Sequence, residues 1–145
     1  MERNDMEKYN TAHGAGVACL EPPNSRSLRK ILITDDDPAV RSVVRRLLES
    51  EGYSNISEAA DGNEGVAVSR KINPDLIMMD YYMGGMDGLE ATRKIKEEMP
   101  AINVIVMTGQ PMPSLVKDCM SAGASSFIIK PFDRKELMNV VKNRI

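Results

Sequence analysis

Four short apolar runs in this chain each end in a polar residue of a kind that binds phosphate or a divalent cation. In chain order, the runs lead into Asp35–Asp36–Asp37, Asp80, Thr108 and Lys130. A run that is apolar throughout is typical of a parallel strand buried on both faces. If the four runs are parallel strands, their carboxyl ends lie along one edge of a sheet, which is where open α/β sheets bind ligands.

Strand-like and helix-like segments alternate from residue 28 to the end of the chain. Alternation of this kind predicts an α/β fold, a doubly wound, five-stranded parallel sheet of the flavodoxin-like type with helices on both faces. The expected strand order is 2-1-3-4-5, which places Asp35 and Asp36 next to Asp80. The expected strands are residues 28–34, 55–59, 75–80, 102–107 and 125–129, and the expected helices begin near Asp37, Asp61, Asp87, Pro113 and Asp133.

The first of these helices has the most complete signals. Asp37 is expected to be its N-cap and Pro38 its first residue. An apolar stripe at helical spacing then predicts the face that packs on the sheet. The stripe consists of Val40, Val43, Val44, Leu47 and Leu48.

The composition is that of a globular protein with a single domain. The 145 residues are 42% hydrophobic and 28% charged, and the formal net charge of -2 gives no electrostatic footprint for nucleic acid. The two cysteines, Cys19 and Cys119, make no disulfide framework, and no apolar stretch is long enough to cross a bilayer. We therefore expect a cytoplasmic protein without membrane association and without direct nucleic acid binding.

Residues 1–28 differ in composition from the rest of the chain. They show no sustained hydrophobic period, and they contain the stretch Glu21–Pro22–Pro23–Asn24–Ser25 near their end. Such a composition is typical of disordered segments and linkers. The expected organisation is a disordered N-terminal leader at residues 1–28, followed by one domain at residues 29–145.

The carboxylates expected at neighbouring strand ends would repel one another. Like charges a few ångströms apart near a protein surface cost about 4 kcal/mol. A cation offsets this cost, and hard oxygen ligands with positions left open for water and phosphate suit Mg²⁺. Lys130 would add a positive charge that pairs with a carboxylate or a phosphoryl oxygen, and Thr108 would add a hydroxyl donor.

This set of groups favours attack by an aspartate carboxylate on a phosphoryl group, which forms an acyl phosphate. Asp80 is the best candidate nucleophile, because it stands alone after its strand. Asp35 and Asp36 are better placed as metal ligands. Asp37 and Asp87 are expected to be helix caps and not ligands.

The same residues carry a resemblance to a known family. The stretch from Arg29 to Ile145 resembles a response-regulator receiver domain of two-component signalling, similar to the chemotaxis response regulator. It covers roughly four-fifths of the chain, and its motifs are highly specific as a set. The matching pieces occur in family order and are Ile31 to Pro38, Asp75 to Asp80, Met83 to Gly88, Met107 to Gly109, Gly123–Ala124 and Lys130 to Phe132.

The resemblance implies a role for each residue at the sheet edge. Asp80 would accept a phosphoryl group from a histidine kinase or a phosphotransfer protein. Mg²⁺ would be the cofactor, and the residues implied as its ligands are Asp35, Asp36, Asp80 and the backbone carbonyl of Tyr82. Thr108 and Lys130 would bind the phosphoryl oxygens, Phe127 would be an aromatic switch, and the Lys130–Pro131 bond would be cis.

The resulting interpretation is a stand-alone response regulator, not an enzyme, that signals through a phosphorylation-dependent contact with an unknown downstream protein. Gly84 stands where the family usually has proline, which predicts a more flexible loop after Asp80. Two alternatives stay open. One is a haloacid-dehalogenase-type phosphatase with Asp35 as nucleophile, and the other is a degenerate receiver that acts as a phosphorylation-independent binding module.

Overall fold

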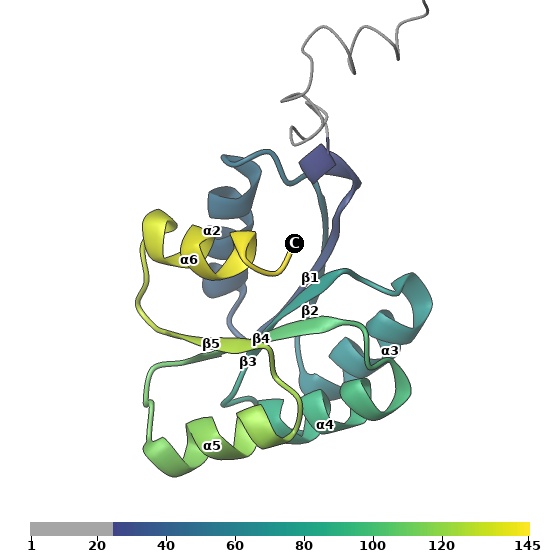
Figure 1. Cartoon of the computed structure of the whole chain (residues 1–145), viewed down its shortest axis with the longest axis vertical. Coiled ribbons are helices and arrows are strands. Elements are labelled where there is room, and N and C mark those ends of the chain that lie inside the picture. The colour runs from purple at the N-terminus through teal and green to yellow at the C-terminus, as the bar shows by residue number, and fades with distance from the viewer. Residues whose placement is uncertain (1–24) are drawn as a thin grey trace, which may run out of the picture.

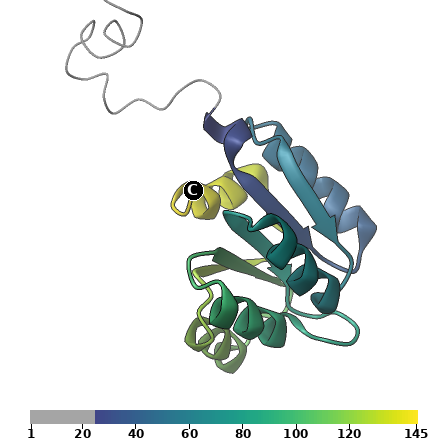
Figure 2. The same cartoon turned by 90° about the vertical axis from the view of Figure 1, so that its right-hand side faces the viewer.

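The computed structural model describes residues 25–145, which form a parallel sheet covered by helices on both faces (Figure 1). The sheet has five strands in the order β2-β1-β3-β4-β5, and every neighbouring pair is parallel. The predicted fold class and strand order are therefore confirmed. The strands are β1 (Lys30–Thr34), β2 (Asn55–Ala59), β3 (Leu76–Asp80), β4 (Asn103–Thr108) and β5 (Ser126–Ile129). Figure 2 shows β1 and β2 side by side and pointing the same way.

The α-helices divide between the two faces of the sheet. Helices α2 (Pro38–Glu49) and α6 (Arg134–Lys142) cover one face, and α3 (Gly62–Ile72), α4 (Gly88–Glu98) and α5 (Pro113–Ser121) cover the other (Figure 1). Each strand is thus connected to the next by a helix that packs on one face of the sheet, and all five strands end at the same edge.

Aspartate caps explain where four of these helices begin. The side chains of Asp37, Asp61, Asp87 and Asp133 each accept a hydrogen bond from a backbone amide in the first turn of the helix that follows. A cap of this kind contributes about 1 kcal/mol, because it satisfies an amide that has no partner within the helix. The caps predicted at Asp37 and Asp87 are confirmed.

The core consists of two clusters, one on each side of the sheet. All five residues of β3 are buried, as expected for a central parallel strand. The apolar stripe of α2 was predicted too wide. Val44 and Leu48 are fully buried, but Val43 is 54% exposed, because that side of α2 faces the loop after β5 and not the sheet.

The strand bounds agree with the predicted ones to within one residue, except at the start of β1. Leu28 belongs to a 3-10 helix, η2 (Ser25–Leu28), and not to the strand. This helix is fastened to the domain by Arg26, which donates to the Glu51 carbonyl at 2.7 Å and lies 5.3 Å from the centre of the Tyr53 ring. The rest of the predicted leader, including Cys19, lies outside the described residues.

None of the helices within residues 25–145 combines the length and the apolar character needed to cross a membrane.

Candidate functional site

The carboxyl ends of β1 and β3 bring three aspartates together. Thr34 pairs with Met79 in the β1–β3 ladder, so Asp35 and Asp36 follow β1 beside Asp80 at the end of β3. Each of the three offers a carboxylate oxygen that lies within 4.8 Å of the others. Asp35 and Asp80 are buried, and Asp36 is exposed. The convergence of acids that the sequence predicts is present.

Lys130 enters this cluster from the end of β5. Its amine donates to Asp35 Oδ2 and to Asp80 Oδ1, both at 2.9 Å. One ammonium group therefore spans two buried carboxylates that lie far apart in the sequence. The Lys130–Pro131 peptide bond that follows is cis, as predicted.

The environment shifts the pKa values of this pair. Burial raises the pKa of the Asp80 carboxyl, and repulsion from Asp35 and Asp36 adds to the rise, while the hydrogen bond from Lys130 opposes it. Burial by itself lowers the pKa of the Lys130 amine, but its hydrogen bonds to Asp80 and Asp35 outweigh burial and raise it. Without a further cation, the cluster is electrostatically strained at Asp80.

Thr108 and Phe127 lie on the neighbouring strands. Thr108 is the buried last residue of β4, one position beyond Met107, which pairs with Asp80. Its hydroxyl accepts a hydrogen bond from the Gln110 amide at 3.1 Å. Phe127 is half-buried and pairs with Val106 in the β4–β5 ladder, so it shares a face of the sheet with Thr108.

Tyr82 lies two residues beyond Asp80, at the start of the loop between β3 and α4. Its side chain is 49% exposed and meets the Tyr81 ring edge-on, with 4.7 Å between ring centres. The neighbouring Tyr81 amide donates to the Met107 carbonyl at 2.9 Å. The predicted role of the Tyr82 carbonyl as a metal ligand stays a prediction.

The donor set fits a hard divalent cation. Three carboxylates with oxygens this close carry more negative charge than one lysine neutralises, and carboxylate oxygens are the ligands that Mg²⁺ prefers. The exposure of Asp36 leaves one side of the cluster open to water, which Mg²⁺ retains in most protein sites. The residues present therefore suit Mg²⁺.

Arg41 is a residue of the site that the sequence reasoning did not single out. Its guanidinium donates to the Asp35 carbonyl at 2.6 Å. The sequence gives no signal for this contact, because it depends on how α2 packs against the end of β1.

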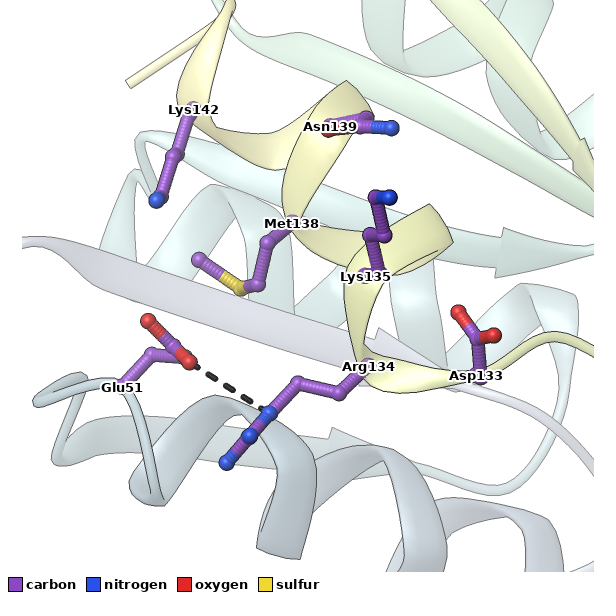
Figure 3. Close-up of a pocket in the computed structure, with 7 residues that line it drawn as sticks. All are labelled: Glu51, Asp133, Arg134, Lys135, Met138, Asn139 and Lys142. Atoms are coloured by element: carbon purple, nitrogen blue, oxygen red, sulfur yellow. Dashed lines mark ion pairs between the residues drawn. The ribbon is translucent and has the colours of Figure 1, made fainter.

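Two hollows lie on the surface near α2 and α6. The first, of about 430 Å³, adjoins Lys130 and is lined almost entirely by apolar groups of α2 and residues 130–132. The second, of about 380 Å³, lies between α6 and Glu51 and holds mixed charges, including an ion pair of 3.6 Å between Arg134 and Glu51 (Figure 3). None of the predicted site residues lines the second hollow.

Comparison with known proteins identifies the family. The sequence pattern of the response regulator receiver domain matches residues 31–142. The chain therefore belongs to the response regulator receiver domain family. Receiver domains are the phosphoacceptor domains of two-component signalling and not classical enzymes, and Mg²⁺ binding is typical of them.

The match covers very different shares of two relatives of this chain. The chain is 34% identical to the virulence regulator BvgA of Bordetella pertussis over 113 residues, which are 78% of this chain and 54% of BvgA. It is also 34% identical to the chemotaxis protein CheY of Halobacterium salinarum, over 79% of this chain and 95% of that protein. The chain spans about half the length of the first of these curated relatives.

A solved structure with the same fold holds a metal. The receiver domain of the sensor histidine kinase PA1611 from Pseudomonas aeruginosa is 30% identical to this chain and superposes with a TM-score of 0.73, covering 80% of this chain and 96% of that one. That structure has a magnesium ion coordinated in its active site cleft.

Proposed function

We propose that this domain accepts a phosphoryl group on Asp80 from a phosphohistidine of a kinase or phosphotransfer protein. The observation that carries the proposal is the Lys130 amine, which bonds to Asp35 and Asp80 at 2.9 Å each. A phosphoryl group transferred to Asp80 would therefore lie beside a positive charge that is already held in place, which supports Asp80 as the acceptor. The family and the fit of the acids to Mg²⁺ support the same reaction.

In the proposed step, a carboxylate oxygen of Asp80 forms a bond to phosphorus as the bond from phosphorus to the donor's imidazole nitrogen breaks. The imidazole leaves with the electron pair of that bond and takes up a proton. Lys130 and Thr108 bind oxygens of the transferred group, so that their positive charge and hydroxyl compensate its negative charge. The groups that would hold Mg²⁺ are the carboxylates of Asp35, Asp36 and Asp80 and the Tyr82 carbonyl, and the ion would supply further charge neutralisation.

The environment of Asp35 argues against the phosphatase alternative. Its side chain is 1% exposed, and both of its carboxylate oxygens are engaged, one by the Asp37 amide at 2.9 Å and the other by Lys130. A nucleophile needs a free oxygen with access to the substrate. Asp35 is therefore better suited to a fixed ligand role than to attack.

A protein donor suits the surroundings of the site. The apolar hollow is lined by Val40, Val43, Pro131 and Phe132, among others, and also by Lys130, the residue whose amine bonds to Asp80. We propose that the phosphohistidine-bearing protein packs here, since apolar burial would fix its imidazole near Asp80. A Val43→Asp variant should lose transfer from the protein donor and keep transfer from phosphoramidate; loss of both would contradict this placement.

The output is proposed to be a protein contact on the face formed by α5, β5 and α6. Met112 and Met120 at α5 and Ile129 in β5 are exposed apolar residues of these elements, and Phe127 of β5 is half-buried and packs against the core. Phosphorylation adds charge at Asp80 and would bias the domain between two shapes. We also propose that it acts without an attached output domain, by analogy with the chemotaxis protein CheY of Halobacterium salinarum, 95% of which the match covers. Immunoblotting of the native protein tests this proposal, because a band much larger than 16.0 kDa would show an attached domain.

Intact mass measurement after incubation with phosphoramidate tests the acceptor role. The parent should gain the mass of one phosphoryl group with Mg²⁺ and not with chelator, and Asp80→Asn should gain none. A label that persists in Asp80→Asn and disappears in Asp35→Ala would favour the phosphatase alternative. No gain from phosphoramidate or from a cognate kinase would favour the degenerate receiver.

A further inference from the structure

Arg41 in the first turns of α2 joins three parts of the structure. Its Nη1 donates to the Asp35 carbonyl at 2.6 Å, and its Nε donates to Glu58 of β2 at 2.8 Å. The side chain is only 17% exposed, so these bonds are largely shielded from water. A guanidinium is planar and presents its donors in a fixed fork, so the two contacts constrain each other.

The carbonyl that Arg41 binds belongs to the peptide group between Asp35 and Asp36. The other groups of Asp35 are also held, because its amide donates to the Ala59 carbonyl at 3.1 Å and its side chain is bonded to the Asp37 amide and to Lys130. Holding the carbonyl constrains the plane of this peptide, and the plane fixes the N–Cα bond of Asp36, which limits where its side chain can lie.

Arg41 is itself held from the side of β2. Glu58 receives Arg41 on one carboxylate oxygen and Arg45 on the other, at 2.8 and 2.7 Å. The hydrogen bond from Arg45, helped by Arg41, holds the pKa of Glu58 below its ordinary value, so Glu58 stays charged. Hydrogen bonds between two charged groups are about twice as strong as those between neutral groups.

We propose that Arg41 is a positioning residue that orients the Asp35–Asp36 peptide and thereby sets the affinity of the acidic cluster for a divalent cation. The inference rests on the proposed function, since that cluster is the proposed Mg²⁺ site. Outer groups that orient metal ligands typically change metal affinity by about 10- to 100-fold.

The sign of the effect separates positioning from simple electrostatics. Arg41 is a cation near a cluster that would bind a cation, so removing its charge should tighten Mg²⁺ binding if charge alone matters. If Arg41 acts through the peptide, removing it should weaken Mg²⁺ binding. The two explanations therefore predict opposite results for one substitution.

Arg45 provides a matched control. It makes an equivalent ion pair with Glu58, but its other guanidinium contacts are with the Ile56 carbonyl at 3.1 Å and with Glu49 at 3.7 Å, and not with the Asp35 carbonyl. Direct Mg²⁺ titration by calorimetry, without a phosphoryl donor, should show a dissociation constant about tenfold higher in Arg41→Ala and within about twofold of the parent in Arg45→Ala. Phosphorylation by phosphoramidate should need more Mg²⁺ in Arg41→Ala, and most of the maximal rate should return at saturating Mg²⁺.

Arg41→Lys keeps the charge and loses the fork, so its Mg²⁺ affinity should fall between those of the parent and Arg41→Ala. It also serves as the test if Arg41→Ala does not fold. An Arg41→Ala or Arg41→Lys affinity equal to or tighter than that of the parent would overturn the proposal, and so would an equal loss in Arg45→Ala. A parent that binds no Mg²⁺ and gains no phosphoryl group would instead overturn the proposed function itself.

Discussion

The two loops that flank the acidic site are held in very different ways. The first loop, residues 35–37, is held by several hydrogen bonds. The Asp35 amide, carbonyl and carboxylate all have partners, and Asp37 caps α2. The second loop, residues 81–87, contains Gly84 and Gly85, and a side-chain carbon built on either would meet nothing within 4 Å. The site is therefore flanked by one loop that is held in place, residues 35–37, and by one loop whose middle is free of close contacts, residues 81–87.

The open loop is nevertheless fixed at its far end. The Gly88 amide donates to the Tyr81 carbonyl at 2.8 Å, and Gly88 packs directly against the Asp80 carbonyl. Met86 lies over Gly62 at the start of α3, where a side-chain carbon would come within 2.6 Å of the Met86 carbonyl oxygen. Only the middle of the loop lacks such contacts, and Gly85 there has a φ of +78°.

This difference suggests a division of work between the loops. Ligands of Mg²⁺ need a fixed geometry, and the first loop carries Asp35 and Asp36, two of the proposed ligands. Under the proposed function, the loop beyond Asp80 would have to leave room for a donor and for the added phosphoryl group, and a glycine pair without neighbours would allow this at little cost. The predictions below test each part of this comparison.

Lys130 bonds to Asp35 of the first loop and to Asp80, from which the second loop begins, so its replacement should have the largest effect on stability and phosphorylation. In Lys130→Met, Asp35 and Asp80 would remain buried without their shared cation, and the free energy of unfolding near neutral pH should fall by about 3 kcal/mol. Phosphorylation by phosphoramidate should fall by about 100-fold or more, since the charge at the transferred oxygens is lost. Urea unfolding and intact mass measurement check the two effects.

The pH dependence of this loss has a defined sign. The pKa of Lys130 is raised above its ordinary value of 10.5, so its stabilisation is complete below that value and disappears as pH rises through the folded pKa. On the acid side the difference between parent and variant should shrink as Asp80 becomes protonated, and it should begin to shrink above the ordinary carboxyl range, because burial raises the pKa of Asp80. A difference independent of pH would contradict the ion-pair interpretation.

The glycines of the second loop should differ sharply from one another. In Gly88→Ala, the added carbon would overlap the Asp80 carbonyl oxygen and lie 2.8 Å from the Tyr81 α-carbon, which should cost about 2 kcal/mol through overpacking. In Gly84→Ala, nothing is displaced, and the free energy of unfolding should stay within about 0.5 kcal/mol of the parent. Equal losses in the two variants would show that the loop is not open in its middle.

The caps at the ends of the two loops give a smaller and more discriminating test. Asp37→Ala and Asp87→Ala each remove one bond to a helix amide, of 2.8 Å in both cases, and each should cost about 1 kcal/mol. Only Asp37→Ala should weaken Mg²⁺ binding, because Asp37 is two residues from Asp35 in a rigid loop. Asp87 is separated from Asp80 by the glycine pair. Similar Mg²⁺ affinities in both variants would contradict the difference in rigidity.

Much of this architecture could be predicted because its signals are local. Asp37–Pro38 followed by an apolar stripe is a local signal of a helix start, and an apolar run ending in Asp80 is recognisable without its neighbours. The meeting of Asp35, Asp36 and Asp80 then follows from the strand order. These steps need the chain sequence, the rules of parallel sheets and a strand order that is common among doubly wound folds.

The contacts that could not be predicted depend on packing between distant elements. The Arg41 bond to the Asp35 carbonyl requires α2 to lie at one position over the β1–β2 pair, and the exposure of Val43 reflects how α2 turns beside Phe132. Likewise, the need for glycine at position 88 arises from the path of the Asp80 backbone. No sequence period encodes these orientations, because they are set only when the elements pack together.

The repulsion within the cluster gives the smallest expected effect. Asp36 raises the pKa of Asp80, so in metal-free buffer Asp36→Asn should relieve repulsion and raise the melting temperature by about 2 °C. The exposed Asp118 on α5 lies outside the cluster, so Asp118→Asn is a control that removes the same charge elsewhere.

Addition of Mg²⁺ should reverse the order of the melting temperatures. The parent and Asp118→Asn should gain more from the metal than Asp36→Asn does, since a carboxylate ligand is stronger than an amide for a hard cation. Melting curves followed by circular dichroism, with chelator and then with Mg²⁺, measure both shifts. Equal gains from Mg²⁺ in all three proteins would mean that Asp36 does not bind the metal, and the preformed first loop would then owe its rigidity to some other requirement of the fold.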